Sequence, residues 1–332
     1  MTLSAEPDAA QDVGELRARV PDFFIVGHAK CGTTALYEML IRHPRIFMPE
    51  LKEPLFFATD LRARFQRRAA GSLPSTLEDY LALFVGAGPQ QRVGEASSSY
   101  LWSREAAGHI ARLQPGARII AILREPASFL RSLHLQLLQN HIESKKDLRQ
   151  ALALEEDRRQ GKRIPRRSTR PQALMYSERV RYVEQLQRYH ALFGADQVMV
   201  LIYDDFRREN EATVRRVLRF LEVDDSYPVH ATEANPTVRM RSQQLDDLVN
   251  AVSVGRGPVS RAVKASVKAI TPKQLRGEAL KLALNHVVYG GVTEPDESVM
   301  LEIRRRYKGE VVALSEYLGR DLVAEWGYDD IG

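Results

Sequence analysis

The chain has 332 residues, of which 44% are hydrophobic and 27% are charged, with 48 Lys and Arg against 43 Asp and Glu. This length permits a substantial buried core, in one large α/β domain or in two small ones. The net charge of +5 suits an anionic ligand but falls short of the concentrated positive field of a dedicated nucleic-acid binder.

The N-terminal segment and the cysteine content indicate the cellular compartment in which the protein is expected. Residues 1–20 are polar and contain no apolar core of a signal peptide, so we expect a loose lead-in there. Cys31 is the one cysteine, which excludes an intrachain disulfide and suits a reducing environment. No segment approaches the roughly 18 consecutive apolar residues of a membrane span. We therefore predict a cytoplasmic protein without a membrane span.

Short apolar runs alternate with amphipathic segments along the chain. The runs typical of buried strands are residues 23–26, Val93 with its neighbours, 118–123 and 198–203. Helical spacing runs from Thr34 to Pro44 and again over residues 176–193 and 210–221. This alternation predicts an α/β fold, with one domain over residues 21–330 and a central, mostly parallel sheet flanked by helices.

Two basic stretches, near residues 155–172 and 253–277, interrupt this pattern. The first contains RRQGKRIPRRSTR, which favours an exposed loop or, alternatively, a mobile cover over an anionic ligand. The second is expected to be a flexible excursion or an amphipathic helix. Neither has the interleaved aromatic residues of a single-strand nucleic-acid platform, so we predict no nucleic-acid partner. The oligomeric state stays open.

A phosphate-binding loop is predicted between the first strand and the first helix, where residues 27–34 read GHAKCGTT. The N–H groups and the positive end of a helix favour an anion there, and glycine lets the backbone approach it. Lys30 supplies a charge, Thr33 and Thr34 supply hydroxyl groups, and Cys31 and Gly32 supply backbone donors. The lysine precedes the second glycine, whereas in a Walker loop it follows. The pattern predicts a P-loop-like nucleotide-binding core with its own spacing.

A second anion-binding element is predicted at the end of the strand 118–123. Arg124 follows that strand directly, and the carboxyl ends of parallel strands border the ligand crevice of α/β proteins. Pro126 is suited to the first position of a helix, which places Ser132 one to two turns along it. Arg124 and Ser132 together are suited to hold a second phosphate, although an arginine after a strand is as often a salt-bridge partner.

These segments together resemble sulfotransferases that use 3′-phosphoadenosine 5′-phosphosulfate (PAPS). HAKCGTT is similar to their 5′-phosphosulfate loop, and LREPASFLRS, with Arg124 and Ser132, to their 3′-phosphate element. The segment KEPLFF at residues 52–57 looks like the KEP-x-FF segment of heparan-type and related bacterial members. The resemblance implies PAPS as donor, 3′-phosphoadenosine 5′-phosphate (PAP) as product and no metal. It also implies that Tyr203 lies near the adenine and that a basic loop with Arg239 and Arg241 closes over the nucleotide.

The reaction needs a group that stabilises the leaving oxygen and a base that deprotonates the acceptor. Lys30 is the candidate for the first role. Glu53 matches the base of heparan-type enzymes, and Glu95, at the end of the strand around Val93, is its rival. His28 and His134 are weaker candidates, each better explained as a packing histidine. Two other functions stay open: a P-loop-type kinase or NTPase that uses ATP and Mg²⁺, and a non-catalytic anion or polynucleotide binder.

The acceptor is predicted to be a small molecule or a carbohydrate that presents a hydroxyl or an amine. The sequence does not rank the residues of the variable middle region that are suited to line its site: Phe65, Tyr80, Phe84, Trp102, His141, Arg166 and Arg167.

Overall fold

The computed structural model describes residues 20–62, 73–166, 168, 171–229 and 296–331, and the backbone of two short strands at residues 239–240 and 289–290. Several sequence predictions lie outside the described residues, namely the lead-in before residue 20, Arg241, the stretch 253–277, Phe65 and Arg167. For Arg239 the structure describes the backbone alone.

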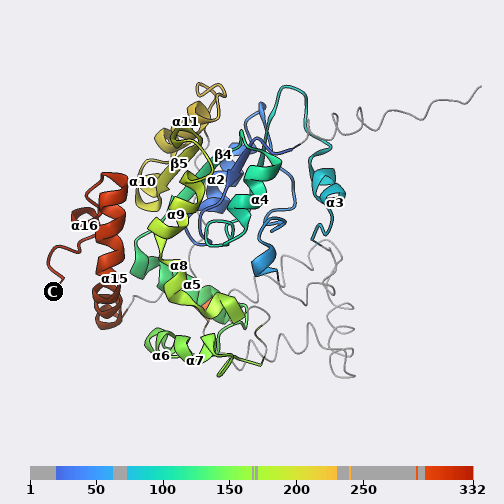
Figure 1. The fold of residues 1–332 in the computed structure, drawn as a ribbon. Coiled ribbons are helices and arrows are strands. Elements are labelled where there is room, and N and C mark those ends of the chain that lie inside the picture. Colours follow the sequence, from blue (N-terminus) through green and yellow to red (C-terminus); the bar gives the residue numbers. More distant parts are fainter. Residues whose placement is uncertain are drawn as a thin grey trace, which may run out of the picture.

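Five parallel strands form the central sheet, which Figure 1 shows in the middle of the molecule. Their order is β2-β3-β1-β4-β5, with bounds β1 (Phe23–Ile25), β2 (Ile46–Phe47), β3 (Arg92–Ala96), β4 (Arg118–Leu123) and β5 (Val198–Ile202). β1 and all of β4 after its first residue are buried, as expected for parallel strands that are covered on both faces. The predicted α/β fold with a parallel central sheet is confirmed.

Helices flank this sheet, with α3 and α4 on one side of the molecule and α15 and α16 on the opposite side (Figure 1). α15 packs against α5 and α9, and α11 packs against α2. The bounds are α2 (Thr33–Leu40), α3 (Leu77–Leu81), α4 (Ala106–Leu113), α5 (Pro126–Gln139), α6 (Leu148–Ala153), α7 (Glu155–Arg159), α8 (Tyr176–Arg179), α9 (Tyr182–His190), α10 (Tyr203–Arg208), α11 (Asn210–Phe220), α15 (Glu297–Leu318) and α16 (Leu322–Glu325). Short 3-10 turns lie at η1 (Thr59–Leu61), η3 (Ala82–Phe84), η4 (Pro171–Leu174) and η5 (Ala195–Gln197), and β6 (Arg239–Met240) pairs with β7 (Tyr289–Gly290) in an antiparallel ladder.

The predicted helix over residues 176–193 is divided in two. α8 ends at Arg179 and α9 begins at Tyr182, whose backbone N–H donates to the Val180 carbonyl over 2.8 Å. The Gln185 side chain donates to the Glu178 carbonyl over 2.8 Å and so satisfies an acceptor that the break leaves open. Periodicity alone predicted one helix because the apolar positions keep their spacing across the break.

Part of the basic stretch near residues 155–172 is helical, which corrects the expectation of a loop. Glu155–Arg159 forms α7, and Arg158 is 3% exposed. Its guanidinium pairs with both carboxylate oxygens of Glu143, with Nη1–Oε2 at 2.7 Å and Nη2–Oε1 at 2.8 Å. The exposed loop begins after α7, at residues 160–163.

The sheet brings the predicted site residues to one edge. Lys30, Glu53, Arg124 and Tyr203 follow β1, β2, β4 and β5 respectively, at the carboxyl ends of these parallel strands. After β1 the chain continues to β2 at one edge of the sheet, whereas after β4 it continues to β5 at the other edge. The direction of winding therefore reverses between the adjacent strands β1 and β4. Gly27 lies at this point, where an added Cβ would come within 2.6 Å of the Ile122 nitrogen.

Candidate functional site

The loop between β1 and α2 is tightly coiled. Lys30 has a φ of 68° and Gly32 a φ of 90°, both in the left-handed region. Gly32 caps α2 without any side-chain hydrogen bond, so the first N–H groups of the helix stay available to an anion. A Cβ at Gly32 would lie 3.1 Å from the Phe206 ring and 3.2 Å from the Tyr203 ring, which adds a steric reason for glycine.

A cavity of about 340 Å³ lies beside this loop, and we call it the loop cavity. Its wall combines loop residues, the ends of neighbouring strands and one residue of α5. They are Ala29, Lys30, Gly32, Thr33, Thr34, Ala35, Lys52, Glu53, Arg124, Gln136 and Tyr203. The structure therefore brings together most of the residues predicted to bind the nucleotide.

Arg124 is held between the loop and an aromatic ring. Its Nη1 donates to the Lys30 carbonyl over 3.0 Å, and its Cζ lies 4.7 Å from the centre of the Tyr203 ring. The Tyr182 hydroxyl donates to the Arg124 carbonyl over 2.9 Å. Burial and the charge of Arg124 lower the pKa of Lys30. Two neighbouring cations favour a multiply charged anion, because its binding would relieve their repulsion.

Cys31 and Ser132 are both buried. The Cys31 side chain is fully buried, and burial raises its pKa to about 12, while its backbone N–H donates to the His28 carbonyl over 3.3 Å. Ser132 lies in α5 and is 2% exposed. Neither residue is part of the wall of the loop cavity.

Glu53 sits at the junction of two strand ends. It has a φ of 61°, and its backbone N–H donates to the Ala96 carbonyl over 3.0 Å. Its carboxylate accepts from the Ser98 N–H at 2.9 Å and from Lys52 Nζ at 3.2 Å. These contacts anchor the carboxylate while leaving it half-buried, in contact with the cavity.

Glu95 has the opposite environment. It is fully buried, and the Tyr80 and Tyr100 hydroxyls donate to its Oε2 over 3.0 and 2.8 Å. Burial raises its pKa to about 7, although hydrogen bonds to the carboxylate oppose this shift. Glu95 lines neither the loop cavity nor the neighbouring cavity described next.

A second cavity, of about 370 Å³, adjoins the first, and we call it the α5 cavity. Its wall is mixed, with aliphatic residues from several segments and polar residues among them. They are Ala29, Glu53, Leu55, Leu61, Leu73, Ser98, Ser99, Trp102, Leu133, Gln136, Leu137, Asn140, Ile142, Gln172, Ala173 and Arg179. Ala29, Glu53 and Gln136 belong to both walls, so the two cavities meet at these residues.

Gln136 was not predicted from the sequence as a site residue. It lies one helical turn after Ser132, and Leu133, Gln136, Leu137 and Asn140 share one face of α5 that borders the α5 cavity. This periodic face was the available signal, but it reads equally well as a packing stripe.

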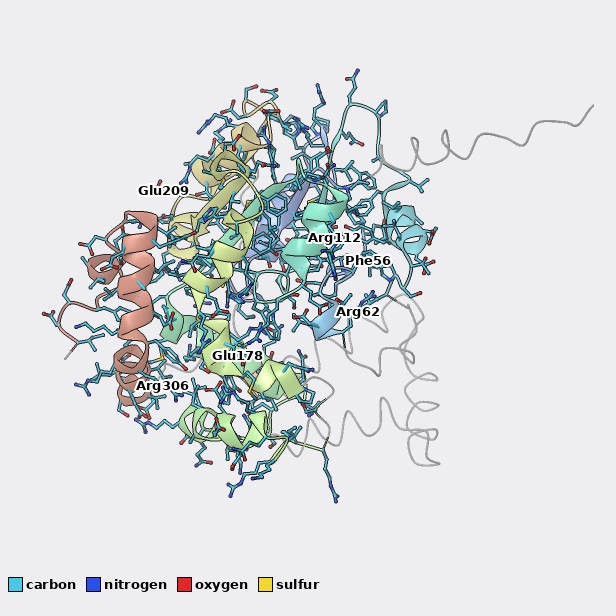
Figure 2. The ribbon with its side chains drawn as sticks, in the orientation of Figure 1. Phe56, Arg62, Arg112, Glu178, Glu209 and Arg306 are labelled. Carbon is cyan, nitrogen blue, oxygen red and sulfur yellow. The ribbon has the colours of Figure 1, made fainter. Side chains whose placement is uncertain are left out.

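The other candidates for an acceptor site fall into different environments. Trp102 lines the α5 cavity. Tyr80 and Phe84 are fully buried in the core, where Tyr80 stacks on Phe56 with ring centres 4.5 Å apart. His141 and Arg166 do not line the cavity. Arg62, which Figure 2 labels together with Phe56, lies over the Phe56 ring, with the guanidinium carbon 5.6 Å from the ring centre.

Both histidines considered as bases are buried packing residues. His28 is fully buried and its Nε2 lies 2.7 Å from Gln185 Oε1. Burial, with a contribution from Arg179, lowers the pKa of His28 to about 3. His134 Nδ1 lies 2.9 Å from the Tyr176 hydroxyl and its Nε2 lies 3.1 Å from the Lys146 carbonyl. Neither histidine lines the cavities.

Comparisons with known proteins agree with this arrangement. A model of the sulfotransferase family matches residues 21–227. Carbohydrate sulfotransferase 15 of Homo sapiens is 30% identical over an alignment that covers 35% of this chain and 27% of that protein. Bifunctional heparan sulfate N-deacetylase/N-sulfotransferase 4 of Mus musculus is 33% identical over 32% of this chain and 12% of that protein. A solved sulfotransferase structure from Alicyclobacillus acidocaldarius is 29% identical, with a TM-score of 0.56, covering 73% of this chain and 95% of the other.

The fold and the loop at the end of β1 thus define a nucleotide-binding α/β protein, and the family match is more specific. This chain belongs to the sulfotransferase family. The matched part spans about a quarter of the length of the carbohydrate sulfotransferase 15 sequences. Across the described part of the chain, no helix is long and apolar enough to cross a membrane. The same residues contain no group of three or more His, Cys, Asp or Glu side chains suited to hold a metal ion.

Proposed function

We propose that this protein transfers a sulfuryl group from PAPS, bound in the loop cavity, to a hydroxyl group or an amine of an acceptor bound in the α5 cavity, with PAP as the second product. The observation that carries this proposal is the shared wall of the two cavities at Ala29, Glu53 and Gln136. A group transferred in line must pass between two sites that meet. A cytoplasmic location stays a prediction from the sequence.

The loop cavity suits the donor for electrostatic reasons. The first turn of α2, Lys30 and the hydroxyls of Thr33 and Thr34 would bind the 5′-phosphate. Negative charge builds on the oxygen that leaves with this phosphate, and the fixed N–H groups and Lys30 would stabilise it. Arg124 would hold the 3′-phosphate, and the Tyr203 ring stacked on Arg124 supports a place for the adenine nearby. Ser132 joins this element only as a sequence prediction, as do Arg239 and Arg241.

Glu53 is the better candidate for the base. Its carboxylate borders both cavities, so an acceptor hydroxyl beside it would also lie near the donor. Glu53 would accept the proton as the acceptor oxygen forms its bond to sulfur and the bond between sulfur and the phosphate oxygen breaks. Glu95 is sequestered by two tyrosine hydroxyls, which supports a structural role for it.

The kinase alternative is not favoured. The chain belongs to a sulfotransferase family, and its lysine lies before the second glycine of the loop. The sulfuryl group carries less charge than a phosphoryl group, which lessens the need for a metal ion in the transfer. Independence of metal is part of the proposal, and EDTA tests it.

The proposal is tested by the release of labelled product from ³⁵S-labelled PAPS in EDTA, with a panel of alcohols, phenols and glycans as acceptors. We expect turnover by the wild type, loss of most turnover in Lys30→Ala, and a fall of about 10²-fold or more in Glu53→Gln, the usual contribution of a general base. Glu95→Gln is the matched control and should stay within a few-fold of wild type. Turnover of ATP that requires Mg²⁺, without turnover of PAPS, would refute the proposal.

A further inference from the structure

The interior of the α5 cavity is aliphatic. Leu133 and Leu137 of α5 are 3% and 4% exposed, and Leu55, Ile142 and Ala173 are 7%, 8% and 7% exposed. All five line this cavity, to which α5, η4 and two loops contribute them. Side chains so buried offer a ligand apolar contact and no hydrogen bond.

Polar side chains of the wall gather at the junction with the loop cavity and at the opening to solvent. Glu53 and Gln136 border both cavities, and the N–H of Ser98 donates to Glu53 over 2.9 Å. Asn140 and Gln172 are exposed and line the α5 cavity alone, so they mark its opening. A ligand that brings its hydroxyl group to Glu53 would therefore place the rest of its body against the aliphatic interior.

The aromatic ring in the wall is partly covered. Trp102 is the one aromatic residue among the described residues that line this cavity, and the guanidinium carbon of Arg179 lies 4.0 Å from the centre of its ring. One face of the ring is therefore closed to a sugar or an aryl group. A sugar also carries a hydroxyl group on nearly every carbon, and each one would lose its water against leucine or isoleucine without a hydrogen bond in return.

We infer that the acceptor is an alkyl alcohol, whose hydrocarbon chain fills the aliphatic interior of the α5 cavity. This inference rests on the proposed function, because it assigns this cavity to the acceptor. The hydroxyl proton would pass to Glu53 while the alcohol oxygen bonds to sulfur, and PAP would leave with the electron pair of the broken bond between sulfur and the phosphate oxygen. The product is an alkyl sulfate.

The first test compares primary alcohols of increasing length as acceptors for the full chain with ³⁵S-labelled PAPS. We expect kcat/KM to rise about tenfold from 1-butanol to 1-hexanol and again to 1-octanol, because each buried methylene group contributes about threefold to fourfold. Diethylene glycol monoethyl ether is the matched control, since it has the length of 1-octanol with ether oxygens in place of two methylene groups. Its kcat/KM should be lower than that of 1-octanol by about tenfold or more.

A variant of Leu137 connects this preference to the cavity. Leu137→Phe places a larger side chain in the interior, so the advantage of 1-octanol over 1-butanol should fall by about tenfold, the effect of two methylene groups. Leu138→Phe is the matched control, because Leu138 is the next residue of α5 and lines neither cavity. If Leu137→Phe does not fold, Leu137→Ala replaces it, and the larger cavity should favour 1-decanol over 1-octanol more than the wild type does.

The inference is overturned if kcat/KM does not rise with chain length, if the ether is as good an acceptor as 1-octanol, or if a uronate-containing disaccharide is a better one. An unchanged preference in the Leu137 variant would also overturn it. Failure of the proposed function gives a different result, namely no binding of PAP and no turnover of any acceptor. Calorimetric titration of the same alcohols into the chain would then still measure the dependence on chain length, and its absence would overturn the inference.

Discussion

At the scale of the residue, Glu53 and Glu95 differ in burial, although the sequence predicts both as candidates for the base. Glu53 follows β2, and Glu95 lies near the carboxyl end of the neighbouring strand β3. Glu53 is anchored by one backbone N–H and one lysine and stays in contact with the cavities. Glu95 is enclosed by Tyr80 and Tyr100. A base must reach its substrate, so this difference in access outweighs the perturbed pKa of Glu95.

The buried carboxyl of Glu95 should make stability depend on pH. Its pKa is raised from 4.5 to about 7, so between these values the unfolded chain has lost the proton that the folded chain keeps. Stability therefore falls as pH rises through this window and then levels off, by about 3 kcal/mol in all. Glu95→Gln lacks this contribution, while its amide oxygen can still accept from the tyrosines.

Urea unfolding at pH 5.0 and pH 7.5 measures this effect as a difference between the two proteins. The free energy of unfolding of the wild type should fall by about 2–3 kcal/mol more than that of Glu95→Gln over this interval. The comparison removes the contribution of His28, whose depressed pKa acts with the opposite sign in both proteins. Parallel pH profiles would show that Glu95 ionises in the folded protein much as it does in the unfolded chain.

At the scale of the element, α5 organises both cavities. Its N-terminus follows Arg124, and Glu125 caps it by accepting from the Ala127 and Ser128 N–H groups at 3.0 and 2.6 Å. Two turns further on, Gln136 borders both cavities. Among the described residues the Gln136 amide has no hydrogen-bond partner, so it is available to the transferred group or to the acceptor.

We expect Gln136→Leu to lower turnover by about tenfold to a hundredfold, since it removes one fixed donor from the place where charge develops. The affinity for PAP should stay within about twofold. Gln139→Leu is the matched control, because Gln139 lies in the same helix but lines neither cavity. Equal activities of the two variants, measured with ³⁵S-labelled PAPS, would show that the Gln136 amide plays no part in the transfer.

Elements with a strong local signal were predicted well, whereas elements set by tertiary contacts were not. The strand at residues 118–123 and the helix that starts at Pro126 agree with the structure, because a wholly apolar run and a proline at the first helical position are local features. The break between α8 and α9 is stabilised by Gln185 reaching back to Glu178. The burial of Arg158 depends on Glu143, fifteen positions earlier.

The same distinction applies to the site. The loop with Lys30, and Arg124 after β4, could be predicted because strand ends of a parallel sheet converge at one edge. The positions of Gln136 and Arg179 in a cavity wall could not be predicted, because that wall is formed by segments distant in the sequence. Periodicity along α5 and α8 predicts which residues share a helix face, but it does not predict whether that face borders a cavity.

At the scale of the whole molecule, the C-terminal segment connects two walls of the loop cavity. The family match ends at residue 227, yet α15 packs on α5 and α9. Arg304 of α15 lies 3.6 Å from Glu125, directly after Arg124. Arg320, just beyond α15, donates to Asp205 of α10 over 3.0 Å, two positions after Tyr203. The C-terminal segment therefore supports the predicted nucleotide site from outside the matched region.

The central claim is that the loop cavity binds a nucleotide with a 3′-phosphate, and calorimetric titration of the full chain with PAP in EDTA, beside ADP and ATP, tests it most directly. We predict clear preference for PAP without metal, and loss of that preference over ADP in Arg124→Ala. Preference for ATP that depends on Mg²⁺ would contradict the account and indicate a variant P-loop. Equal loss of affinity for PAP and ADP in Arg124→Ala would instead contradict the assignment of Arg124 to the 3′-phosphate.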